Sequence, residues 1–326
     1  MSSVAPTHPS RGLLVASVAI AVVSGALTAL QTRVNSQLAI ELGDGFVASA
    51  ISFGSGLVIL TVAVLVAPTG RRGVALLRDS VRARETPWWH LIGGVCGAFF
   101  VLSQGLTAAV MGVALFTIAV VATQSVTGAV IDRVGIGDLP KRPVTLLRII
   151  ASILALAAVG FSGVAELRAD VPIGLLILPL VAGVGVGYQQ AINGQVRHIS
   201  RSALAATFLN FLTGTAVLIV ALVAHTIAVG WVATFPGELW LYSGGVIAVL
   251  FIGGATHVVR TIGVLLLGLG TIAGQLVGAL LLDLLVPIEG RGLTLTTVVG
   301  TLLTLVAVTL AVLSAQRAQQ SATTAS

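Results

Sequence analysis

The chain has 326 residues, of which 56% are hydrophobic and only 9% are charged. A soluble domain carries about 25% charged residues, so this chain has too few charges to cover a surface in contact with water. The net charge of +6 does not indicate a nucleic-acid partner, because the basic residues lie in short gaps between apolar runs. The single cysteine, Cys96, excludes an internal disulfide and a cysteine-built metal site. The composition therefore predicts an all-α integral membrane protein in a lipid bilayer, with no metal or cofactor.

Ten apolar runs are long enough to cross a bilayer, which takes about 20 residues. They lie at 12–35, 46–67, 88–108, 110–131, 144–163, 171–194, 203–226, 239–257, 261–286 and 292–314. The remaining ends, 1–11 and 316–326, are predicted tails. The first run has the length of a signal peptide, but it has a partner in the internal repeat described below, which argues against cleavage.

The basic residues predict the orientation of the chain. With the N-terminus in the cytoplasm, 14 of the 17 Lys and Arg residues lie on the inner side. Only Arg33, Arg168 and Arg291 lie outside. Cytoplasmic loops carry an excess of Lys and Arg, so both termini are predicted to be cytoplasmic.

An internal repeat relates the two halves of the chain. At an offset of 158, Gln31, Asn35 and Gln37 fall on Gln189, Asn193 and Gln195, and Ser52-Phe53 falls on Asn210-Phe211. At an offset of 151, three further pairs match: Gly93-Gly94 with Gly244-Gly245, Gln124 with Gln275, and Asp132 with Asp283. The repeat predicts two units, 12–165 and 166–315. Each has five spans, an odd number, so the units are predicted to be inverted, as in many transporters.

The motifs of the first unit resemble those of a known family. Gly25-Ala-Leu-Thr-Ala-Leu-Gln31-Thr-Arg-Val-Asn35-Ser-Gln37, Ser52-Phe53-Gly54-Ser55-Gly56 and Gln124-Ser-Val-Thr-Gly-Ala-Val-Ile-Asp132-Arg-Val-Gly135 are similar to motifs of the YdcZ-like inner-membrane exporters. That family belongs to the drug/metabolite transporter (EamA-like) superfamily. The resemblance implies a fused two-repeat exporter in the bacterial inner membrane, without naming a cargo. The second unit departs from the motif, since Leu284 replaces Arg133.

Gln124 and Gln275 are candidate substrate-binding residues near the middle of two spans. Polar groups at this depth usually face a cavity or a partner, because they are costly in hydrocarbon. Their amides would donate and accept hydrogen bonds to a polar substrate. The alternative is that they join neighbouring helices, as amides commonly do in membranes.

Asp132 and Asp283 are candidate coupling or gating residues. In an inverted pair, Asp132 lies near the cytoplasmic mouth and Asp283 near the outer mouth. Each would attract a cation or bind a proton. The alternative for Asp132 is a helix-end residue paired with Arg133 or Arg148.

Gln31 and Asn35 share a helix face, and Gln189 and Asn193 repeat this spacing. These four are candidate substrate-binding residues in the outer and inner vestibules; the alternative is capping at the membrane interface. Gln104, His257 and Arg260 are interpreted as interfacial anchors, and Arg33 as a partner of Glu41 or Asp44.

Together these features predict a secondary transporter, which exports a small metabolite or drug-like solute by alternating access. No Walker motif is present, so the energy would come from a gradient of protons, another cation or the substrate. An enzyme is disfavoured, because few ionisable groups lie at membrane depth. The alternative function is a non-transporting membrane subunit or a lipid-carrier translocator with the same fold.

Overall fold

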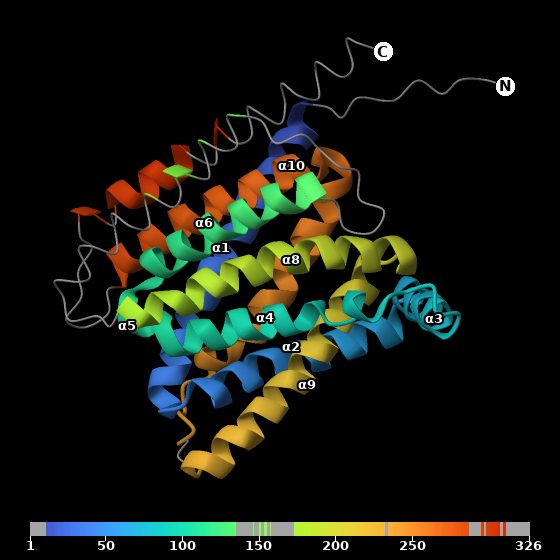
Figure 1. Cartoon of the computed structure of the whole chain (residues 1–326), viewed down its shortest axis with the longest axis horizontal. Coiled ribbons are helices and arrows are strands. Elements are labelled where there is room, and N and C mark those ends of the chain that lie inside the picture. The colour runs from blue at the N-terminus through green and yellow to red at the C-terminus, as the bar shows by residue number, and fades with distance from the viewer. Residues whose placement is uncertain are drawn as a thin grey trace.

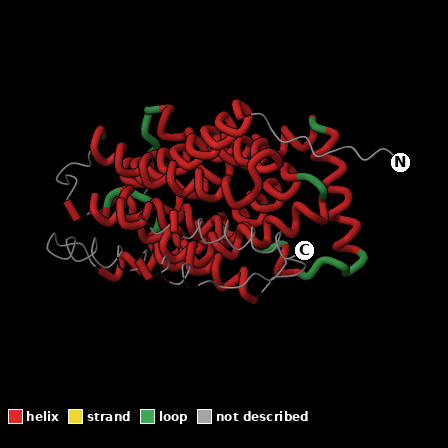
Figure 2. Tube along the Cα trace, turned by 90° about the horizontal axis from the view of Figure 1, so that it is seen from above, coloured by secondary structure: helices red, strands yellow, loops and turns green. Residues whose placement is uncertain are grey.

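The computed structural model describes residues 11–134, 173–231 and 234–286, with shorter helical stretches at 146, 150, 153–154, 157, 295–296, 298–306 and 309–310. All regular structure in these residues is helical (Figure 2). Six helical segments there are long and apolar enough to cross a membrane. They are α1 (Arg11–Leu42), α2 (Gly45–Val66), the stretch Trp88–Met111, α6 (Val113–Val134), α8 (Ile177–Ser200) and α9 (Ala203–Val229).

The stretch Trp88–Met111 is not one regular helix. It contains η1 (Trp88–His90), α4 (Gly93–Ser103), the π-helical turn η2 (Gln104–Ala108) and α5 (Ala109–Met111). Gly112 then takes a φ of +83°, a conformation that favours glycine. The chain changes direction there, so α6 starts as a separate helix.

The described helices match the predicted runs closely in the first 131 residues and between 171 and 226. The predicted runs 239–257 and 261–286 match two shorter apolar helices, Leu239–Ile252 and Gly270–Leu285. The run 144–163 lies mostly outside the described residues, as do the predicted tails, whereas the run 292–314 is described in part, as helix at 295–296, 298–306 and 309–310.

The 42-residue helix α10 (Gly244–Leu285), which follows η4 (Leu239–Ser243), turns back on itself. A straight helix of that length would span about 63 Å at about 1.5 Å per residue, twice the thickness of the hydrocarbon core. The start of α10 is bonded to α1, since Gln31 donates to the Gly244 carbonyl. Its end is also beside α1, because Ala279 packs against Ala29. Both ends of α10 therefore flank the same part of α1, and α10 supplies two antiparallel legs (Figure 1).

A helix that the sequence did not predict, α3 (Pro68–Arg82), follows α2. Its glycine face packs on the start of α9: a Cβ on Gly73 would lie 2.5 Å from the Cβ of Ser202 and 2.8 Å from that of Ala205. Ser202 is also the N-cap of α9. The arginines of α3 are exposed, so this amphipathic helix covers the α8–α9 connection with its apolar side.

Two helix crossings at the centre are related by the repeat. Gly94 of α4 lies against the backbone of α9 at Asn210 and Gly214, and a side chain would not fit there. Its repeat-matched residue, Gly245 of α10, lies in the same way against α2, at Ser52 and Gly56.

Between these crossings two aromatic rings meet. Phe53 and Phe211 stack with their centroids 4.8 Å apart. Phe53 lies against Gly214, and Phe211 lies against Gly56. Every partner in this arrangement has a repeat-matched partner in the other half of the chain, so the predicted register also describes the packing.

Candidate functional site

A buried polar cluster joins α1 to η2. It consists of Gln31, Thr32 and Asn35 of α1 and Gln104 of η2, and we call it the α1 cluster. Asn35 donates from Nδ2 to Gln104 Oε1 at 2.8 Å, and Gln104 donates from Nε2 to Thr32 Oγ1 at 2.8 Å. Gln31 donates from Nε2 to the Gly244 carbonyl at 3.1 Å. None of the four side chains is more than 4% exposed. The amides thus connect α1 to η2 and to the first leg of α10.

Gln104 belongs to this cluster because of the π-helical turn. η2 begins at Gln104, and π-turns frequently mark functional sites. The interpretation of Gln104 as an interfacial anchor was therefore wrong: its side chain is 0% exposed and bonded on both sides. His257 and Arg260 lie in α10, but their side chains fall outside the described set.

Two polar atoms beside the α1 cluster have no hydrogen-bond partner among the described residues. They are Asn35 Oδ1 and Ser52 Oγ. Both approach Gly244, where a Cβ would lie 2.8 Å from Ser52 Oγ and closer still to Asn35 Oδ1. Buried polar groups are normally satisfied, so these two atoms are exceptions, and both lie at the start of α10.

The repeat-matched cluster lies on α8 and α9, and we call Gln189, Gln190, Asn193 and Asn210 the α8 cluster. Gln189 donates from Nε2 to Asn210 Oδ1 at 2.7 Å. Asn193 Oδ1 lies 3.4 Å from where a Cβ on Gly93 would stand, which repeats the approach of Asn35 to Gly244. Gln189 and Asn193 are only half-buried, however, and Gln190 is exposed.

The packing around the two clusters also differs. Among the described residues, α1 packs against η2, whereas α8 and α10, which carry the repeat-matched positions, have no comparable packing. The residue that matches Gln104 at the offset of 151 is Ala255, which has no amide. The α1 cluster is therefore closed by η2, and the described residues show no such closure of the α8 cluster.

Gln124 and Gln275 lie away from both clusters, at two further repeat-related contacts. Gly25 of α1 lies against the backbone of α10 at Thr271 and Gln275. The repeat-matched Gly183 of α8 lies against the backbone of α6 at Val120, one turn from Gln124, and Gly187 has its Cβ position 3.1 Å from the Gln124 carbonyl oxygen. Gln275 is buried and Gln124 is half-buried. The structure thus brings each glutamine beside a span of the other half, but it does not join the two glutamines to the α1 or α8 cluster.

Asp283 bridges α10 and the first turn of α6. Its Oδ1 accepts from the Val113 N–H at 3.2 Å, and its Oδ2 accepts from the Ala114 N–H at 2.7 Å. Free N–H groups at a helix start bind carboxylates well. Arg33 of α1 is close enough for its charge to act on this carboxylate, and its Nη1 is buried without a hydrogen-bond partner in the described residues. Asp132 lies in α6, but its side chain is outside the described set.

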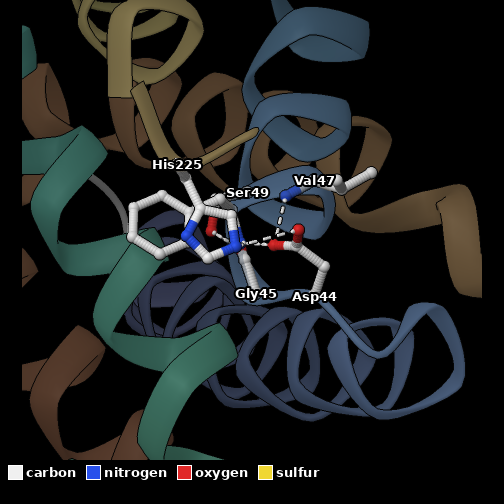
Figure 3. Close-up of polar contacts among 6 residues, drawn as sticks. Asp44, Gly45, Val47, Ser49 and His225 are labelled. Atoms are coloured by element: carbon white, nitrogen blue, oxygen red, sulfur yellow. Dashed lines mark hydrogen bonds and ion pairs between the residues drawn. The ribbon is translucent and has the colours of Figure 1, made fainter. Parts of the chain in front are cut away.

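The pairing of Arg33 with Asp44 is not observed, because Asp44 pairs with His225 (Figure 3). His225 Nε2 lies 3.3 Å from Asp44 Oδ2, and the His225 ring stacks on Phe46 at 4.3 Å. Asp44 Oδ1 also accepts from the N–H groups of Phe46 and Val47, which caps α2. The sequence signal for the cap was present, since Asp precedes an apolar run. The contact with His225, 181 residues later in the chain, had no such signal. Glu41 accepts instead from Gln37.

No three His, Cys, Asp or Glu residues come together in the described part of the chain. The arrangement offers amide, hydroxyl and carboxylate groups between helices, which can bind a polar solute reversibly.

Comparison with known proteins places the chain in a family. The model of the family described as "Putative inner membrane exporter, YdcZ" matches twice, at residues 16–161 and 174–310. No curated protein matches the sequence. One similar solved structure, described only as "Crystal structure of protein", superposes with a TM-score of 0.56. It covers 94% of this chain and 99% of its own, at 18% identity, and so shares the fold alone.

Proposed function

Because the chain belongs to the YdcZ family of inner-membrane exporters, we propose that it is a secondary transporter that exports a small metabolite or drug-like solute by alternating access. It would lie in the bacterial inner membrane with both termini in the cytoplasm. Two five-helix units, 12–165 and 166–315, would have opposite orientations. Transport in general follows from the family; the inverted units and the mechanism are our proposal.

The observation that carries the proposal is the contrast between the two clusters. If the two units are inverted, the repeated motif lines both mouths of one pathway. The α1 cluster would then lie at the outer mouth and the α8 cluster at the cytoplasmic mouth. In alternating access, one mouth is closed while the other is open. The buried α1 cluster and the half-exposed α8 cluster fit a conformation that is closed to the outside and open to the cytoplasm.

The matched glycine crossings support a rocking motion. Gly94 and Gly245 hold the two halves together at contacts that the repeat relates, with Phe53 and Phe211 between them. Contacts at such a centre are kept when the two halves exchange conformations. The polar clusters, which lie elsewhere on α1 and α8, are the parts that change partners.

In this proposal Gln124 and Gln275 bind the solute at the membrane centre, and Gln31, Asn35, Gln189 and Asn193 bind it on the way in and out. Asp283 is an outer gate, because it bonds α10 to the start of α6 across the two halves. Asp132 would have this role at the inner mouth. A proton or another cation that binds either carboxylate would weaken the bond and so couple transport to a gradient.

The test is a transport assay with the purified protein in proteoliposomes, run against a broad panel of metabolites and drug-like solutes. We expect saturable exchange of one solute class. Reporter fusions test the inverted units separately: Ser80 should report the cytoplasm and Arg168 the exterior. If folded protein moves no solute, transport is ruled out for the panel, and a labelled lipid-carrier assay then examines the alternative function.

A further inference from the structure

The short helix α3 lies across one end of the bundle. Figure 1 shows it nearly end-on, while α2, which leads into it, runs across the picture. Gly70, Gly73 and Leu77 form its buried side, and Gly73 approaches the start of α9. An amphipathic helix in such a position lies in the plane of the membrane interface, with its polar face towards the lipid headgroups. Trp88 and Trp89, which are exposed a few residues further along the chain, are typical of the same depth.

The polar face of α3 carries a row of three arginines. Arg71, Arg78 and Arg82 are spaced by seven and four residues, so they share one side of the helix, and all three are exposed. Asp79 is the single acidic residue of α3. Its carboxylate lies 3.3 Å from Arg78 Nε, and both side chains of this pair are exposed. Arginine has five N–H donors, so the pair leaves most of the Arg78 guanidinium for an anion.

An apolar row on α2 leads to the first of these arginines. Val58, Val62 and Leu65 are spaced by four and three residues on one side of α2, and each is more than half exposed. Arg71 folds back on the end of α2, where its Nη1 donates to the carbonyl oxygens of Leu65 and Val66. The guanidinium of Arg71 is thereby held at the end of the apolar row.

We propose that these two rows form a binding site for an anionic phospholipid of the cytoplasmic leaflet. The acyl chains lie along the row on α2, and the phosphate binds at the row of arginines on α3. Arginine suits a phosphate because its planar guanidinium can donate two parallel hydrogen bonds. The site, which we call the α2–α3 lipid site, consists of Val58, Val62, Leu65, Arg71, Arg78 and Arg82.

The charge of the arginine row selects the lipid. The cytoplasmic leaflet has a negative surface potential, which attracts basic segments beside a membrane span. A lipid with a net negative charge is therefore preferred over a zwitterionic lipid, whose cationic group the arginines repel. The α2–α3 lipid site stands whether or not the chain transports a solute, because none of its residues belongs to the polar clusters.

Phosphatidylglycerol and phosphatidylcholine with the same acyl chains are the probes. Each is titrated into the purified full-length protein in detergent, and the bound lipid is measured by native mass spectrometry. We expect phosphatidylglycerol to bind at least about tenfold more tightly. Glycerol phosphate, which has the anion without the chains, should not displace it. Equal affinities for the two lipids, or displacement by glycerol phosphate, would overturn the proposal.

Two double variants separate the arginine row from the overall charge. Arg78→Gln with Arg82→Gln should weaken the binding of phosphatidylglycerol about 25-fold, because each basic residue beside an anionic surface contributes a factor of about five. Arg72→Gln with Arg84→Gln is the matched control. It removes the same charge from exposed positions of the same segment that lie outside the row, and the preference for phosphatidylglycerol should persist. Equal losses in both double variants would contradict the site.

A second measurement locates the bound lipid without a change to any arginine. Leu65→Trp puts a fluorescent ring in the apolar row, and the signal of the four natural tryptophans is subtracted with the unsubstituted protein. Brominated phosphatidylglycerol should quench the added ring more strongly than brominated phosphatidylcholine. Val220→Trp, at an exposed position of α9 far along the helix from its contact with α3, is the control and should show no preference. Absence of a preference at Leu65→Trp, or an equal preference at both positions, would refute the α2–α3 lipid site.

Discussion

The α1 cluster and the α8 cluster share a Gln and an Asn four residues apart, Gln31 and Asn35 in one and Gln189 and Asn193 in the other, yet these residues are bonded differently. Gln31 donates to Gly244 in the opposite half of the chain, whereas Gln189 donates to Asn210 in its own half. Asn35 is buried against Gln104 and is 1% exposed, whereas Asn193 is half-buried. One motif therefore has two sets of partners in one molecule, as we would expect of the two mouths in the proposed alternating cycle.

This comparison also indicates what changes during conversion. If the halves exchange conformations, Gln189 releases Asn210 and donates to the Gly93 carbonyl, as Gln31 now does to Gly244. Gln31 then bonds within its own half, to Ser52, whose hydroxyl has no partner among the described residues. Under the proposed mechanism, the Ser52 hydroxyl would thus be bonded in the opposite conformation.

The largest expected effect comes from the crossings that both conformations share. Gly94→Ala and Gly245→Ala each place a methyl group into the backbone of a neighbouring helix. We expect each to destabilise the protein by about 1–3 kcal/mol, measured as thermal unfolding in detergent. Gly54→Ala is the control, because nothing lies within 4 Å of its Cβ position. Tolerance of one change but not the other would show that the two crossings are not equivalent.

Gln124→Leu and Gln275→Leu test whether the two matched glutamines contribute equally to transport, although the two polar clusters differ. Leucine keeps the helix and removes the polar functions. In the proteoliposome assay we expect each change to reduce transport strongly and to a similar extent, with expression preserved. Wild-type transport by the double variant would assign both amides to helix–helix contacts.

The contrast in burial predicts unequal costs for the repeated asparagine. Asn35→Leu leaves Gln104 Oε1 buried without its donor, which costs about 1–3 kcal/mol. Asn193→Leu removes a half-exposed amide, and surface changes usually stay within about 0.5 kcal/mol. Equal losses in unfolding temperature would contradict the view that the α1 cluster is closed and the α8 cluster open.

The sequence predicted the parts of this comparison that depend on local patterns and on the repeat. Long apolar runs identified the helices, and rare Asn, Gln and Gly residues at fixed offsets identified pairs of positions, such as Gly94 and Gly245, that lie at equivalent helix crossings. The sequence did not reveal that Gln104 joins the α1 cluster, because a π-turn has no recognisable pattern. It also did not reveal α3, because its arginines were read as a loop between spans. The partners of Asp283 are 169 and 170 residues away, and contacts at that distance follow only from packing.

Asp283→Asn examines the outer gate. Asparagine keeps the shape but replaces one accepting oxygen with an N–H group, which cannot accept from Val113 or Ala114. The loss of a charge-assisted bond at a helix start costs about 0.5–2 kcal/mol. If a proton or cation acts through this carboxylate, the variant should lose gradient-driven accumulation and retain solute exchange. Loss of both would indicate an electrostatic role in solute binding, and no change between pH 6 and pH 8 would remove Asp283 from the transport cycle.

The smallest effect is expected at the contact between Asp44 and His225, which has no counterpart at the other end of the bundle. At the offset of 158, Asp44 falls on Ser202, and His225 falls on Ala67, where α3 packs on α9 instead. His225→Phe keeps a ring to stack on Phe46 and removes only the pairing with Asp44. A partly exposed pair contributes about 0–1 kcal/mol, so we expect a small loss of unfolding temperature. Asp44→Ala also removes the cap of α2 and should cost more, about 0.5–2 kcal/mol. Equal losses in the two variants would mean that the contact of Asp44 with His225, and not the cap, accounts for the contribution of Asp44 to stability.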